Sequence, residues 1–279
     1  MPTYDPVVAI TSTFLDDHHL VVGETHFHCD FPLKDVPAGR LPVMKTRDMI
    51  GPYVALCERV RPVRIAELGI RRGGSTALLN ELARPEKLVA VELQSAPAPA
   101  LTSYIERHGM AEVVRPHYGV DQADRVRLAG LIDAELGGHL LDLVVDDASH
   151  RYEETRSSFE TLFPRLRTDG IFVIEDWRGR HLMMDRIAAS LQDPTPHGRA
   201  AIEEILRRQA TGPAPPQPAP LSKLAFELVL ARASSEEAVA ELSLDGYWIR
   251  VRRGPGPLDP STFRLSDLYE DHFGLIRNA

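Results

Sequence analysis

Short apolar runs alternate with amphipathic stretches through the central part of the chain. Runs of apolar, β-branched residues predict strands, and apolar residues spaced three or four apart predict helices. The predicted strands are Val63–Leu68, Leu88–Leu93, a third that begins at Val113, Leu140–Val145 and Ile171–Ile174. The predicted helices are Asp48–Val60, Ser75–Ala83, Thr102–His108, Arg125–Glu135 and Glu153–Leu166. This alternation favours a parallel sheet with right-handed crossovers and helices on both faces.

The pattern changes after the fifth predicted strand. Residues 181–191 and 200–209 have helical spacing, and residues 213–220 hold five prolines in eight positions, which predicts an extended segment. Further on, two β-prone runs, 239–244 and 247–251, flank Asp245-Gly246, a strong signal for a two-residue hairpin. A parallel sheet closed by an antiparallel hairpin is typical of the Rossmann-like α/β fold of S-adenosylmethionine (SAM)-dependent methyltransferases.

We expect one decorated α/β domain. Residues 1–46 mix β-prone runs with turn signals, and we expect this N-terminal extension to contact substrate or another subunit. Residues 47–279 form the predicted methyltransferase domain. Within it, residues 178–224 directly follow the last parallel strand and include the proline-rich segment, so we expect them to form a lid over the acceptor.

Composition narrows the class of protein. The chain has 279 residues and a formal net charge of −8, which disfavours a general nucleic-acid binder. No apolar run is long enough for a membrane span, and the start of the chain lacks the pattern of a signal peptide. The two cysteines, Cys29 and Cys57, do not support a disulfide scaffold. We expect a cytoplasmic protein that forms a homo-oligomer and binds neither membrane nor nucleic acid.

A glycine-rich turn follows the first strand. Glycines let the backbone approach a ligand, and the helix start beyond them offers unpaired N–H groups. Arg71 replaces the middle glycine of a dinucleotide-binding fingerprint, which disfavours an NAD(P)-dependent oxidoreductase. The pattern E-x-G-x-x-x-G-x-S/T resembles the SAM-binding motif of class I methyltransferases; a plain glycine turn is the alternative. The resemblance implies a cofactor-binding role for Glu67, Gly69, Gly73, Ser75 and Thr76.

Further cofactor-binding candidates follow the next strands. Glu92 ends the second strand, where an acid can accept both ribose hydroxyls. Asp121 and Gln122 follow the third strand and are expected on the adenine side. Asp146, at the end of the fourth strand, completes the expected cofactor-binding set.

Acidic residues end two adjacent strands. Asp147 follows the fourth strand, and Glu175 and Asp176 follow the fifth. Neighbouring parallel strands lie about 4.8 Å apart, so these carboxylates can converge, and close carboxylates repel unless a proton or cation intervenes. An all-oxygen site suits Mg²⁺, with Mn²⁺ or Ca²⁺ as substitutes. Helix capping by Asp147 or Ser149 is the alternative, although it does not explain acids at both strand ends.

His150 lies three residues beyond Asp147. An imidazole with an ordinary pKa near 6.5 can act as a general base at neutral pH. We therefore assign His150 as the candidate catalytic residue. His26 and His28 also share one face of a predicted strand, but no second ligand pair at suitable spacing supports a zinc site there.

The motifs resemble those of one family. The phrases Asp147-Ala148-Ser149-His150 and Ile174-Glu175-Asp176 are similar to those of the metal-dependent sugar O-methyltransferases of macrolide antibiotic biosynthesis, the macrocin and mycinamicin type. The resemblance covers roughly residues 60–180. It implies that Asp147, Glu175 and Asp176 bind Mg²⁺, that His150 is the base and that Glu92 holds the SAM ribose.

The expected activity is Mg²⁺-dependent transfer of the SAM methyl group to a hydroxyl of a small natural product. We expect this acceptor to be glycosylated and to carry vicinal hydroxyls. Three alternatives remain: an NAD(P)-dependent oxidoreductase, a metal-independent methyltransferase, and a non-catalytic protein that retains the SAM fold.

Overall fold

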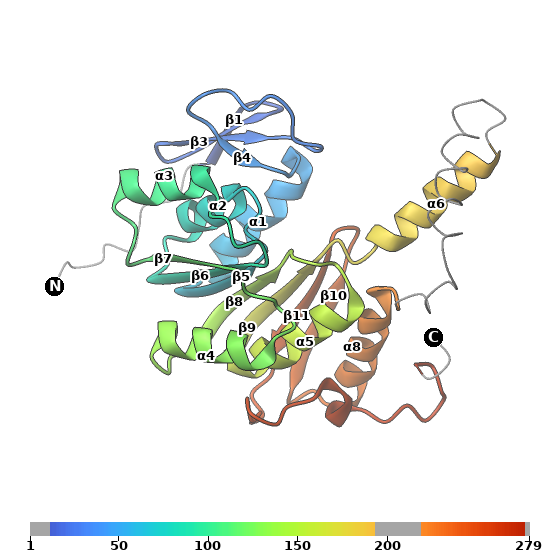
Figure 1. The fold of residues 1–279 in the computed structure, drawn as a ribbon. Helices are drawn as coiled ribbons and strands as arrows, with labels where there is room; N and C mark the ends of the chain where they lie inside the picture. The colour runs from blue at the N-terminus through green and yellow to red at the C-terminus, as the bar shows by residue number, and fades with distance from the viewer. Residues whose placement is uncertain (1–11, 193–218, 277–279) are drawn as a thin grey trace.

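Two sheets organise the part of the chain that the computed structural model describes, residues 12–192 and 219–276 (Figure 1). The larger sheet has seven strands in the order β10-β11-β9-β8-β5-β6-β7. Its parallel strands are β5 (Arg64–Leu68), β6 (Lys87–Glu92), β7 (Val114–Tyr118), β8 (Leu141–Asp146) and β9 (Leu166–Glu175). The hairpin β10 (Val239–Leu244) and β11 (Trp248–Arg253) adds to β9 in antiparallel register. This arrangement confirms the predicted parallel sheet closed by an antiparallel hairpin.

Helices cover both faces of the larger sheet. One face packs against α1 (Arg47–Val60), α2 (Gly74–Ala83) and α3 (Pro99–His108). The other packs against α4 (Arg125–Leu136), α5 (Tyr152–Leu162) and α8 (Ser222–Ser234). Successive strand residues serve opposite faces, since Leu143 and Val145 join the first core and Val144 joins the second. All three are fully buried, which explains why β8 is a continuous apolar run.

The N-terminal extension forms a separate four-stranded sheet. Its strands, in spatial order, are β1 (Ser12–Asp16), β2 (His19–Val22), β3 (Thr25–Cys29) and β4 (Leu41–Val43). Leu20, Phe27 and Val43 on this sheet belong to the same buried cluster as α1 and α2. The extension is therefore part of the core of the fold. Its expected contact with substrate or another subunit stays a prediction.

The region around Pro164 differs from the sequence prediction. The helix predicted to reach residue 166 ends at residue 162 and is followed by a 3-10 turn, η1 (Phe163–Arg165). Proline lacks a backbone N–H and disrupts a continuing α-helix, so it ends α5 here. Strand β9 then begins at residue 166, five residues before the predicted start at Ile171. The β8–β9 register shifts at this irregularity.

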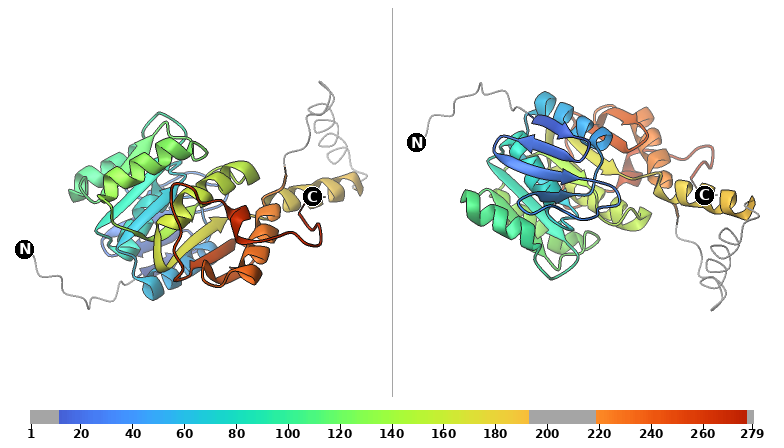
Figure 2. Two further views of the ribbon diagram at one scale, coloured as in Figure 1. Left: turned by 90° about the horizontal axis from the view of Figure 1, so that it is seen from below. Right: turned by 90° about the horizontal axis from the view of Figure 1, so that it is seen from above.

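The segment after β9 leaves the body of the molecule. Helix α6 (Gly179–Gln192) projects away from both sheets in all three views (Figures 1 and 2). The predicted helix 200–209 and most of the proline-rich segment lie outside the described residues, so the expected lid stays a prediction. The last element, η2 (Leu265–Leu268), packs its Leu265 into the α4–α5 core. No helix within residues 12–192 and 219–276 is both long and apolar enough to cross a membrane.

Candidate active site

A cavity of about 700 Å³ opens at the carboxyl ends of the parallel strands. The glycine loop, the loops after β6, β7 and β8, and Asp176 line it, together with Phe31, Pro42, Met44 and Lys45 of the extension. The strand order reverses between β5 and β8, which is the switch point where open α/β sheets bind ligands. The sheet topology and the cavity therefore indicate one binding site.

At two positions of the glycine loop, a positive φ and a close backbone or side-chain neighbour together require glycine. Gly69 has φ +97°, and a Cβ there would lie 2.3 Å from the carbonyl oxygen of Asp147. Gly73 has φ +85°, and its Cβ would lie 2.4 Å from that of Leu101. Both glycines let the loop pack tightly against neighbouring segments, and Gly69 brings the β5 and β8 loops together at the cavity.

Glu67 and Thr76 lie behind the glycine loop. Glu67 is 1% exposed, and the hydroxyl of Thr76 donates to its Oε2 over 2.5 Å. Burial raises the pKa of Glu67 to about 7, an effect that the hydroxyl of Thr76 partly offsets. Glu67 is not among the cavity-lining residues, whereas Ser75 is. The structure thus places Glu67 where it ties β5 to the start of α2.

Glu92 holds the glycine loop from the next strand. Its Oε2 accepts hydrogen bonds from the backbone N–H groups of Ile70 at 3.1 Å and Arg71 at 2.7 Å. Its Oε1 accepts from Gln94 N–H at 3.0 Å. Glu92 also lines the cavity, so one carboxylate both holds the glycine loop and borders the cavity.

Asp146 and Gln122 support the loop after β8. Both are buried, and Gln122 Nε2 donates to Asp146 Oδ2 at 3.0 Å. The hydroxyl of Ser158 also donates to Asp146, and Gln122 Oε1 accepts from Ser149 N–H at 3.0 Å. Burial raises the pKa of Asp146 to about 6, although the hydrogen bond from Ser158 lowers that pKa in part. Asp121 and Gln122 both line the cavity. Asp146 does not line it, and its hydrogen bonds hold the loop after β8.

Asp147, His150 and Asp176 converge at the cavity. His150 Nε2 lies 3.8 Å from Asp147 Oδ1 and 4.0 Å from Asp176 Oδ2. One ligand atom of each residue lies within 4.8 Å of the other two, so the three could share a metal ion. No other group of three or more His, Cys, Asp or Glu side chains in the described part of the chain meets this distance. The two carboxylates, part-exposed to solvent so that waters can complete the shell, fit a hard divalent cation. The imidazole is a softer ligand and lies beside them.

Two of these residues have unusual backbone conformations. His150 and Asp176 have φ of +53° and +52°, a left-handed region that non-glycine residues adopt at a cost. The hairpin turn holds the second of them in place, because Asp176 N–H donates to the Tyr247 carbonyl at 3.0 Å. Trp177 Nε1 also donates to the Asp245 carbonyl at 2.9 Å. The β10–β11 hairpin therefore positions an acid of the site.

Lys45 is a site residue that sequence reasoning missed. Its ammonium donates to Asp147 Oδ2 at 2.7 Å and to Glu175 Oε2 at 2.8 Å. The residue is 4% exposed. Burial alone would lower the pKa of Lys45, but the carboxylates of Glu175 and Asp147 outweigh it and raise the pKa above its ordinary value. Glu175 is accordingly buried and paired, unlike Asp176, whose side chain is 42% exposed.

The paired histidines of β3 do not form part of this site. His26 Nδ1 lies 2.8 Å from His19 Nε2, and no third metal-ligating group completes a cluster with them among the described residues. His26 is exposed, whereas His28 is buried and lies with its ring 5.9 Å from that of His18.

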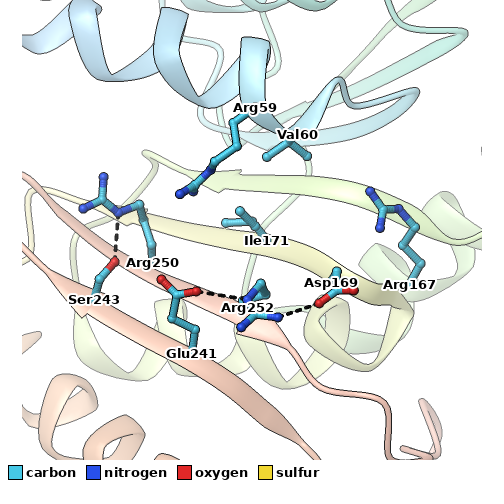
Figure 3. Close-up of a pocket in the computed structure, with 9 residues that line it drawn as sticks. All are labelled: Arg59, Val60, Arg167, Asp169, Ile171, Glu241, Ser243, Arg250 and Arg252. Carbon is cyan, nitrogen blue, oxygen red and sulfur yellow. Dashed lines mark hydrogen bonds and ion pairs between the residues drawn. The ribbon is translucent and has the colours of Figure 1, made fainter.

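A second cavity, of about 330 Å³, lies toward the amino end of β9 (Figure 3). Arginines dominate its lining, and none of the predicted site residues lies there. Arg252 pairs with Asp169 at 2.6 Å and with Glu241 at 3.1 Å, both within the cavity wall. Arg250 pairs with Asp245 at 2.9 Å.

Comparison with known proteins gives a family match over the central part of the chain. Residues 66–177 match a family described as "Methyltransferase domain". A Streptomyces olivaceus protein, 8-demethyl-8-(2-methoxy-alpha-L-rhamnosyl)-tetracenomycin-C 3'-O-methyltransferase, is 30% identical over 125 residues, or 42% of this chain and 28% of that protein. Demethylmacrocin O-methyltransferase of Streptomyces fradiae is 54% identical over 35 residues, or 12% of this chain and 9% of that protein. The chain covers less than a third of either relative.

Among solved structures, the MycE methyltransferase from the mycinamycin biosynthetic pathway, in complex with Mg and SAH, is similar with a TM-score of 0.46. The two are 19% identical, over 76% of this chain and 50% of that chain. The family match confirms the methyltransferase resemblance drawn from the sequence. Residues 66–177 are thus similar to a methyltransferase domain, and they lie in a parallel sheet that the β10–β11 hairpin closes.

Proposed function

We propose that this protein is a Mg²⁺-dependent O-methyltransferase that moves the methyl group of SAM to a hydroxyl of a small, glycosylated natural product. The convergence of Asp147, His150 and Asp176 at a cavity that the glycine loop also lines carries the proposal. The names of the two relatives, which refer to O-methylation of rhamnosyl tetracenomycin-C and of demethylmacrocin, support the choice of substrate class.

The cofactor side of the cavity comprises the glycine loop, Glu92, Asp121 and Gln122. Bound SAM supplies an electrophilic methyl group on a sulfonium. In the proposal, Glu92 accepts from the ribose hydroxyls, Asp121 and Gln122 flank the adenine, and Ser75 faces the methionine portion. Glu67, Thr76 and Asp146 do not line the cavity, and their hydrogen bonds hold the glycine loop and the loop after β8 in place.

The acceptor side comprises Asp147, His150 and Asp176. A divalent cation held there, Mg²⁺ or Mn²⁺ or Ca²⁺ in its place, supplies Lewis acidity that lowers the pKa of an acceptor hydroxyl. Asp147 and Asp176 provide carboxylate ligands on either side of His150. His150 Nε2 takes the hydroxyl proton as the acceptor oxygen attacks the methyl carbon, and the bond from that carbon to the sulfonium breaks to leave SAH. Much of the rate comes from holding the two reactants in line.

The test is methyl transfer to a panel of glycosides with free vicinal hydroxyls, followed by mass spectrometry. The protein is first treated with EDTA, and Mg²⁺ is then restored. We expect a methylated glycoside only with SAM and a divalent cation. Activity that is unchanged by EDTA would refute the metal role and favour a metal-independent methyltransferase.

A calorimetric titration separates the remaining alternatives. We expect binding of SAM and none of NAD(P)H. Binding of NAD(P)H without SAM would favour an oxidoreductase, whereas SAM binding with no turnover on any glycoside of the panel would favour a non-catalytic binding protein.

A further inference from the structure

The chain between β8 and α5 carries His150 between two anchored ends. On the β8 side, the N–H of Ser149 donates to Gln122 Oε1 at 3.0 Å. On the α5 side, the side chain of Arg151 is 63% exposed, whereas Tyr152, the first residue of the helix, is 4% exposed. Tyr152 is therefore the first buried side chain after His150.

A buried acid of α8 holds the hydroxyl of Tyr152. The hydroxyl donates to Glu227 Oε1 at 3.0 Å, and Glu227 is 3% exposed. Helices α5 and α8 lie side by side on one face of the larger sheet (Figure 1). Arg156, one turn further along α5, has its Nε 3.6 Å from the other oxygen of Glu227. Burial and the charge of Glu227 raise the pKa of Tyr152, so its hydroxyl remains a donor at neutral pH.

A second hydroxyl reaches the same carboxylate oxygen from another part of the chain. Tyr269 follows η2 and donates to Glu227 Oε1, also at 3.0 Å. The two hydrogen bonds should contribute similar amounts to stability. Tyr269 belongs to the C-terminal segment, whereas Tyr152 lies two residues from His150. Only the bond of Tyr152 is continuous with the loop that carries the imidazole.

We propose that Tyr152 is a positioning residue for His150, because its bond to Glu227 fixes the start of α5 and thereby the imidazole. The imidazole then stays beside Asp147 and Asp176, with Nε2 at 3.8 and 4.0 Å from their carboxylate oxygens. His150 has φ +53°, a conformation that persists only when its surroundings support it. A displacement of about 1 Å can cost about 10² in rate, so a bond outside the cavity can affect turnover. The effect on turnover rests on the proposed function, in which His150 is the base.

The experiment compares Tyr152→Phe with Tyr269→Phe as the matched control, since each change removes one hydroxyl from the same carboxylate oxygen. Initial rates over a range of SAM and glycoside concentrations give kcat and KM, and thermal unfolding gives the Tm. A third measurement needs no turnover. The ¹³Cε1–H signals of the histidines report their surroundings by NMR, and the spectrum of His150→Ala identifies the signal of His150.

We expect both variants to lower the Tm by a similar amount, roughly 2–4 °C, because each loses one hydrogen bond. Tyr152→Phe should also lower kcat by roughly tenfold, with KM for SAM within about twofold of the wild-type value. Tyr269→Phe should keep the wild-type kcat. The His150 signal should shift in Tyr152→Phe and stay at its wild-type position in Tyr269→Phe.

A loss of kcat that is equal in the two variants, or absent from Tyr152→Phe, would overturn the proposal and leave the hydroxyl with a structural role only. A His150 signal that does not move in Tyr152→Phe would overturn it as well. A wild-type protein that methylates no glycoside would refute the proposed function instead. The NMR comparison would then still decide whether Tyr152 positions His150.

Discussion

The two cavities lie toward opposite ends of the same sheet and differ in how their charges are paired. In the cavity toward the amino end of β9, Arg252 lies between Asp169 and Glu241 and forms an ion pair with each of them across adjacent strands. In the cavity at the carboxyl ends, Lys45 satisfies only one oxygen of Asp147 and one of Glu175. Asp147 Oδ1 and Asp176 face His150 at 3.8 to 4.0 Å, beyond hydrogen-bond distance. The first arrangement holds strands together, and the second leaves donor atoms for a ligand.

The largest expected effect follows from removing the histidine of the carboxyl-end cavity. His150→Ala should lower turnover by roughly 10²–10⁴, because it removes the general base, and it should leave SAM affinity unchanged. Initial rates and calorimetry measure the two quantities. A near-normal rate would remove His150 from the mechanism.

A smaller effect is expected at the glycine that brings two loops of this cavity together. Gly69→Ala adds a Cβ 2.3 Å from a backbone oxygen at φ +97°, which should lower the free energy of unfolding by roughly 2–5 kcal/mol. The matched control is Gly130→Ala in α4, where the Cβ meets nothing within 4 Å. That change should stabilise the protein by about 0.5–1 kcal/mol. Denaturant unfolding compares them, and equal effects would contradict the close approach at Gly69.

The smallest effect is expected in the arginine-lined cavity. Arg252→Ala removes two ion pairs between part-exposed groups, which should cost less than about 1 kcal/mol of stability. Turnover and SAM affinity should stay at wild-type values, because this cavity is remote from the acids of the site. A large loss of turnover would show that the two cavities are coupled.

Most of the fold could be predicted from the sequence because its signals are local. The apolar run that became β8 and the Asp245-Gly246 turn each determine one element. Helix α8 was not predicted. Apolar residues lie on both its faces, since Phe226 and Val229 are exposed while Leu224 and Leu228 are buried, so its apolar spacing is a weak helical signal. The end of α5 was placed too late, because Pro164 outweighs the apolar spacing that continues past it.

The site was only partly predictable, for a different reason. Asp147 and His150 are close in sequence, and the parallel pairing of β8 with β9 brings Asp176 to them. Lys45 lies 102 residues from Asp147 and 130 from Glu175 along the chain. Its role depends on how the small sheet packs against α2, and no local pattern encodes that packing. The one available signal was that Lys45 is among four lysines in a chain with 28 arginines.

The most direct test of the central claim is a crystal structure with SAH and Mn²⁺, examined by anomalous scattering. We predict an anomalous peak between Asp147 Oδ1 and Asp176, beside His150, with SAH against the glycine loop and Glu92. Absence of a peak there at saturating Mn²⁺, or a peak held by other residues, would contradict the assignment of the carboxyl-end acids as a metal site.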